Sequence, residues 1–119
     1  MAKHNFKKLK IWTESMSLVQ ETYRLIRSFP EFEKYNLGSQ LLRCSVSIPS
    51  NIAEGTSKNT KKHFQNYLDI SLGSAFEWET QLIIAYNENY ISEEKFKELE
   101  NKIQQIQMMI TGFKDKMKF

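Results

Sequence analysis

The chain has 119 residues and a net charge of +3, with 40% apolar and 26% charged residues and only four Gly and two Pro. This composition excludes a disordered, linker-rich or collagen-like chain and favours a single domain over residues 1–119, because a chain of this length buries roughly two thirds of its unfolded surface. The small net charge conceals an asymmetry, since residues 1–68 carry 11 basic and 5 acidic side chains whereas residues 69–100 carry 2 and 8.

The first predicted helix covers residues 9–28, where apolar residues recur at spacings of three and four. Pro30 ends it, because proline cannot continue a helix and biases Phe29 towards an extended conformation. Residues 29–36 should therefore form a connection. The stripe expected to face the core consists of Trp12, Met16, Val19, Tyr23 and Ile26, flanked by Ile11, Leu18 and Leu25.

The second predicted helix covers residues 36–55 and contains a proline. Asn36 is a good N-cap, and Gly55 suits the left-handed position after a helix end. Pro49 removes one backbone N–H and its ring clashes with the carbonyl of Ser45, so we expect a kink there. The apolar stripe of this helix is Leu37, Leu41, Cys44, Ile48 and Ile52.

The third predicted helix covers residues 60–87, with Thr60 as its N-cap. One face is marked by Phe64, Leu68, Ala75, Leu82 and Ala85. Other apolar residues spread around the remaining faces, and a helix apolar on several sides needs more cover than three neighbours supply. A subunit interface is therefore predicted on this helix, which implies a homo-oligomer. The additional apolar residues are Tyr67, Ile70, Leu72, Phe76, Trp78, Ile83, Ile84 and Tyr86.

The fourth predicted helix covers residues 92–117. Ser92 caps it and is followed by two acids that suit the positive end of the helix. Its heptad pattern is typical of bundle packing. Four helices with short connections predict an all-α fold, an up-down-up-down antiparallel four-helix bundle whose second helix is kinked at Pro49. The heptad residues are Phe96, Leu99, Ile103, Ile106, Ile110, Phe113 and Met117.

The sequence contains no recognisable catalytic, metal or cofactor motif. His4 and His63 are the only histidines and are far apart, and no Glu-x-x-His motif of di-iron bundles occurs. Cys44 lies on an apolar stripe, where a small buried thiol is favoured over a nucleophile. We therefore expect a non-enzymatic protein with no metal and no cofactor.

A polar cluster surrounds the proline of the second helix, namely Arg43, Ser47, Ser50, Asn51 and Glu54. One interpretation is structural: these side chains satisfy the backbone near Pro49 and bond Glu77 or Glu79 across a helix or subunit boundary. The other interpretation is a ligand site. We favour the structural or interface role, because a proline leaves unpaired backbone groups nearby.

The same segment, residues 47–55 (SIPSNIAEG), closely resembles the signature of the four-helix-bundle proteins encoded in intervening sequences of bacterial 23S ribosomal RNA genes. The resemblance extends to Phe6, Leu9 and Trp12, to residues 40–43, and to a segment with Gly73, Ser74, Glu77, Glu79, Gln81 and Leu82. It implies homopentameric rings without enzymatic activity. Related accessory proteins of diversity-generating retroelements bind a reverse transcriptase and nucleic acid. Lys58 stands where the family usually has an arginine, and lysine lacks the planar fork that clamps a phosphate.

Two functions remain open. The first is binding of RNA or DNA through basic residues at the N-terminus and around the second loop, against the alternative that these lysines only solubilise the surface. The second is a protein-docking scaffold that presents an apolar or acidic surface within residues 69–100 to a partner such as a polymerase. The candidate nucleic-acid ligands are Lys3, Lys7, Lys8, Lys10, Lys58, Lys61, Lys62 and His63.

The sequence also predicts a cytoplasmic protein that does not enter a membrane. The longest strongly apolar run, residues 82–86, has five residues, whereas a bilayer-spanning helix needs about 20. The basic N-terminus lacks the apolar stretch of a signal peptide. The single cysteine excludes an internal disulfide and is consistent with a reducing compartment.

Overall fold

The computed structural model describes residues 5–117, and every regular element among them is helical. The all-α prediction is confirmed, and the four long helices begin and end within two residues of the predicted bounds. No described helix combines the length and hydropathy needed to cross a membrane. The elements are η1 (Phe6–Lys8), α1 (Lys10–Ile26), α2 (Glu31–Lys34), α3 (Leu37–Gly55), α4 (Lys61–Asn87) and α5 (Glu93–Asp115).

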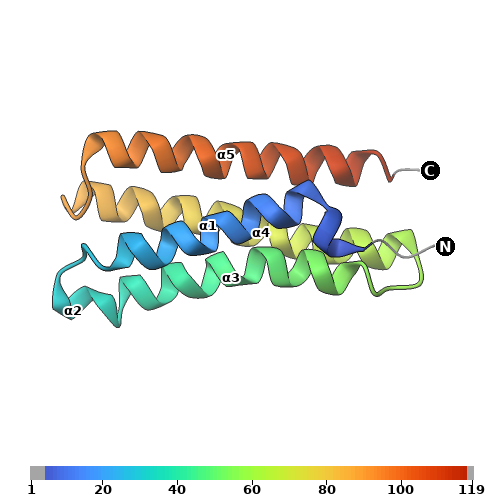
Figure 1. Cartoon of the computed structure of the whole chain (residues 1–119), viewed down its shortest axis with the longest axis horizontal. Helices are drawn as coiled ribbons and strands as arrows, with labels where there is room; N and C mark the ends of the chain where they lie inside the picture. Colours follow the sequence, from blue (N-terminus) through green and yellow to red (C-terminus); the bar gives the residue numbers. More distant parts are fainter. Residues whose placement is uncertain (1–4, 118–119) are drawn as a thin grey trace.

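The four long helices lie side by side in an elongated body of 47 × 23 × 20 Å (Figure 1). Helix α3 packs against α1 and α4, and α5 packs against α4 and α1. The α1–α3 and α4–α5 connections lie at one end of the body, whereas the α3–α4 connection lies at the other, together with the first and last described residues (Figure 1).

Local capping explains where α4 and α5 begin and where α4 ends. The hydroxyls of Thr60 and Ser92 accept the backbone N–H groups of His63 and Lys95, as predicted for N-caps. Helix α4 ends at Asn87, and Asn89, two residues later, adopts φ 65°. The N–H groups of Asn89 and Tyr90 donate to the carbonyls of Tyr86 and Ala85, which is the Schellman arrangement with asparagine in place of glycine.

Two local predictions around α3 are wrong. The Asn36 side chain does not cap α3, because it donates to Glu33 in the short helix α2 that occupies the predicted connection. Gly55 does not adopt a left-handed conformation but is buried as the last residue of α3. A Cβ atom at Gly55 would lie 2.8 Å from the Phe64 ring, so glycine is required by the close approach of α3 and α4.

The core-facing stripe of α1 also differs from the prediction. The buried residues of α1 are Ile11, Ser15, Leu18, Thr22 and Leu25, so the predicted stripe from Trp12 to Ile26 lies beside the core and partly outside it. The two polar residues of the buried stripe are accommodated because Ser15 and Thr22 donate to the carbonyls of Ile11 and Leu18. Thr22 also accepts the indole N–H of Trp78 at 3.1 Å.

Candidate functional site

The fold gathers predicted basic residues from separate segments at the end that holds the α3–α4 connection (Figure 1). Lys7 and Lys8 lie in η1, which contacts α3, and Lys10 is the first residue of α1. The segment is anchored because the Asn5 side chain caps η1 and the Phe6 ring packs edge-on against Trp12 at 5.3 Å. We call this end of the molecule the basic end. Its exposed members from the sequence prediction are Lys7, Lys8, Lys10, Lys61, Lys62 and His63.

Lys58 makes two contacts within its own chain. Its ammonium group lies 4.8 Å from the centroid of the Tyr67 ring and 3.9 Å from a carboxylate oxygen of Glu54. Both contacts are within the chain, and the Lys58 side chain is only partly exposed. Lys58 therefore links the end of α3 to α4, and these contacts make it a weak candidate for phosphate binding.

The sequence prediction missed two lysines of the basic end, Lys114 and Lys116, which end α5 and follow it. Lys114 pairs with Asp69 of α4, whereas Lys116 is exposed. The available signal was the charge of residues 101–119, which hold four basic and one acidic residue. Lys3 and His4 lie outside the described residues.

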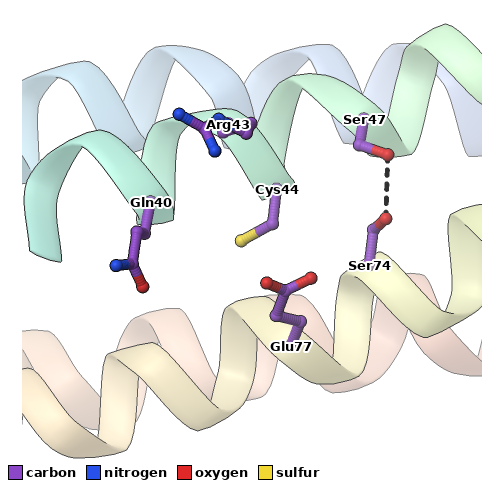
Figure 2. A pocket seen from close by; sticks show the side chains of 6 residues that line it. All are labelled: Gln40, Arg43, Cys44, Ser47, Ser74 and Glu77. Carbon is purple, nitrogen blue, oxygen red and sulfur yellow. Dashed lines mark hydrogen bonds between the residues drawn. The ribbon is translucent and has the colours of Figure 1, made fainter.

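Two residues of the predicted polar cluster, Arg43 and Ser47, line a cleft of about 300 Å³ between α3 and α4 (Figure 2). The other residues that line it are Gln40, Cys44, Ser74 and Glu77. Ser47 and Ser74 share a hydrogen bond of 2.8 Å across the two helices. The Asn51 amide donates to both the carbonyl and the hydroxyl of Ser47. From α4, the Ser71 hydroxyl donates to the carbonyl of Ile48. These bonds support the structural interpretation of Ser47 and Asn51.

The charged residues of this cleft do not pair with one another within the described part of the chain. Glu77 accepts a hydrogen bond from Gln81 at 3.4 Å, and Arg43 forms no ion pair with it. Figure 2 shows Gln40 and Glu77 between the helices, whereas the Arg43 guanidinium lies over α3. Glu79 does not bond this cluster, because it faces α5 and accepts from Gln104 and Gln107.

The remaining predicted structural residues lie inside the chain. Pro49 is buried within α3, and the helix continues through this residue. The Ser45 hydroxyl, one turn before Pro49, donates to the carbonyl of Leu42. The kink at Pro49 stays a prediction. Trp78 is fully buried in the core. Cys44 is also buried, and burial together with the nearby Glu77 charge raises the pKa of its thiol to about 12. The thiol is therefore protonated at neutral pH and is a poor nucleophile.

No group of three or more His, Cys, Asp or Glu side chains suited to hold a metal ion occurs within residues 5–117.

Comparison with known proteins identifies the family. No curated protein matches the sequence. A protein of Bacteroides thetaiotaomicron, described as of unknown function and from the S23 ribosomal protein family, has a similar solved structure with a TM-score of 0.82. It is 24% identical and is matched over 88% of this chain and 95% of its own, which shows the fold. The family model described as 23S rRNA-intervening sequence protein matches residues 7–112, and the chain therefore belongs to this family.

Proposed function

We propose that this protein is a non-enzymatic homo-oligomer that binds nucleic acid, RNA in preference to DNA, through its basic end. The observation that carries the proposal is the convergence of exposed cations from η1, the start of α1, the start of α4 and the end of α5 on one end of an elongated body. The opposite end carries more acids than bases, although Arg24, Arg27, Lys34, Lys95 and Lys97 also lie there. The acidic residues of that end include Glu31, Glu33, Glu88, Glu93, Glu94 and Glu98.

The proposed contacts are with phosphates and not with base edges. Lysine ammonium groups act as point charges, and no arginine fork is present among the basic-end residues. Exposed lysines on short surface segments can follow the backbone of a structured RNA without reading its sequence. Several copies in one oligomer would bind a long RNA more tightly than a single copy, because binding at the second site becomes intramolecular.

The family and the chemistry of the chain support a binding role over a catalytic one. The family is named for the intervening sequences of 23S rRNA genes, which motivates RNA as the first ligand to test. The only cysteine is buried with a raised pKa, which opposes a thiol nucleophile. As an RNA-binding protein, the chain is expected in the cytoplasm.

The test is fluorescence anisotropy of a labelled structured RNA titrated with the protein at two salt concentrations. If four lysines contact phosphates, the affinity should fall about 50- to 150-fold between 50 and 200 mM salt. The quadruple variant Lys7→Ala, Lys8→Ala, Lys61→Ala, Lys62→Ala should bind weakly and lose most of this salt dependence. Binding that is absent at low salt, or unchanged in the variant, would contradict the proposal.

A matched control removes positive charge from the acidic end. Lys95 and Lys97 lie in the first turns of α5, and both pair with glutamates. The variant Lys95→Ala, Lys97→Ala should bind RNA as well as the wild type does. A loss equal to that of the basic-end variant would mean that net charge, and not the basic end, controls binding.

Protein docking is the second candidate function. It is favoured by large exposed aromatic residues on α2 at the acidic end, where Phe32 is 73% and Tyr35 86% exposed. Side chains of this kind commonly anchor protein interfaces. A docking partner held by these rings would bind with little dependence on salt, in contrast to RNA.

A further inference from the structure

The basic end contains an apolar hollow of about 320 Å³ between the start of α1 and the end of α5. Leu9 and Ile11 line it from the first of these segments, and Met109 and Phe113 line it from α5. Ile11 is buried, whereas the other three side chains are partly buried and pack against the core. The apolar lining is therefore partly open to solvent.

Gly112 leaves space on the α5 side of this hollow. It is one of the residues that line the hollow, and a Cβ atom built on it would meet no other atom within 4 Å. Glycine inside a helix is destabilising relative to alanine, and it is commonly found where another group approaches the backbone closely. No other part of the described chain fills the space beside Gly112, so this space is open to a ligand.

Two lysines belong to the same hollow. Lys10, the first residue of α1, and Lys116, which follows α5, both line it, and both are exposed. Lys7 and Lys8 of η1 shortly precede this segment along the chain and are exposed as well. The hollow thus combines an apolar floor with cations from two separate segments.

We infer that this hollow binds one unpaired base of an RNA while Lys10 and Lys116 contact the phosphates beside it. The inference rests on the proposed RNA binding and names the class of RNA, which is RNA with unpaired nucleotides. The lysines favour an anionic ligand, and the apolar floor favours a ligand with a flat or apolar group. A nucleotide carries a phosphate next to a flat base, so it satisfies both features together.

A fully paired duplex uses only one of the two features. Its bases are stacked and paired, so it offers mainly phosphates and sugars to a surface of this kind. An unpaired base can leave the stack and place its face on apolar and aromatic side chains. Contact with the face of a base tolerates any base, so the expected preference is for unpaired over paired RNA and not for a particular sequence.

The experiment measures fluorescence anisotropy with the full chain and three labelled RNAs. The first RNA is a perfect duplex, the second is the same duplex with one bulged adenosine, and the third carries an abasic nucleotide in place of that adenosine. The wild-type protein should bind the bulged RNA about 5- to 150-fold more tightly than the other two, which is the range for loss of one base–aromatic contact. The bulged and abasic RNAs carry the same phosphates, so their difference in affinity reports the base alone.

The variant Gly112→Leu tests the hollow without a change of charge. A leucine side chain would occupy the open space, and removal of the glycine favours the helix, so the variant should keep its circular dichroism. It should bind the three RNAs equally and keep the salt dependence of the wild type, because every lysine is retained. Thr111→Leu is the matched control, since Thr111 is exposed on α5 and does not line the hollow, and it should keep the preference for the bulged RNA.

The outcomes separate this inference from the proposed function. Salt-sensitive binding of equal strength to all three RNAs by the wild type would overturn the inference and leave RNA binding through the basic end standing. A preference for the bulged RNA that persists in Gly112→Leu would place the base elsewhere and would also overturn it. Absence of binding to every RNA at low salt would remove the proposed function and this inference together.

Discussion

Replacing Gly55 with alanine is expected to destabilise the fold, although alanine is the better helix former. Gly55 is buried at the end of α3, and a Cβ atom there would lie 2.8 and 3.1 Å from two atoms of the Phe64 ring and 3.1 Å from the Cβ of Tyr67. The Phe64 ring is fully buried, so it cannot move aside into solvent. Overpacking of this kind costs about 1–3 kcal/mol, and relief of the glycine penalty offsets about 0.5–1 kcal/mol.

The net effect of Gly55→Ala should be a loss of about 0.5–2 kcal/mol in the free energy of unfolding. Urea unfolding followed by circular dichroism at fixed protein concentration measures it. Gly112→Ala is the control, because a Cβ at Gly112 meets no atom within 4 Å and the variant should gain about 0.5–1 kcal/mol. Equal stabilisation by both substitutions would refute the argument that glycine at position 55 serves the contact between α3 and α4.

Two further predictions concern buried polar groups. Thr22→Val should lower the free energy of unfolding by about 1–3 kcal/mol, because it leaves the buried indole N–H of Trp78 without its acceptor. In a Trp78→Phe background most of this loss should vanish. A loss that persists in that background would contradict the role of the hydrogen bond. The raised pKa of Cys44 means that the folded state favours the protonated thiol, so its contribution to stability is complete below the unfolded pKa of 9.0 and is lost as pH rises towards about 12. The unfolding free energy of the wild type should accordingly fall more steeply across this pH range than that of Cys44→Ala, and parallel curves would refute the assignment.

The helix boundaries were predictable because they depend on neighbouring residues. Thr60 and Ser92 bond N–H groups three residues ahead, and Pro30 stops α1 through its own ring. The prediction for Asn36 was wrong because its side-chain amide donates to Glu33. Glu33 belongs to the short helix α2, which the sequence pattern does not predict. The left-handed conformation predicted for Gly55 was wrong for a related reason. The role of this glycine depends on the ring of Phe64, nine residues away.

The orientation of α1 was not predictable from periodicity. Two stripes with the same spacing lie next to each other, and the one with the larger apolar residues points away from the core centre. Ser15 and Thr22 lower the apparent hydrophobicity of the stripe that is buried, yet both satisfy their hydroxyls on the preceding turn, and Thr22 receives a donor from α4, 56 residues along the chain. Such contacts with distant segments are absent from the local pattern, so periodicity alone does not identify the buried stripe.

The candidate binding residues were predictable as a list but not as a surface. Their charges can be read from the sequence, whereas the gathering of η1, the start of α4 and the end of α5 at one end depends on the order in which the helices pack. The fold also ties Lys58 to its own chain, because Tyr67 and Glu54 contact its ammonium group.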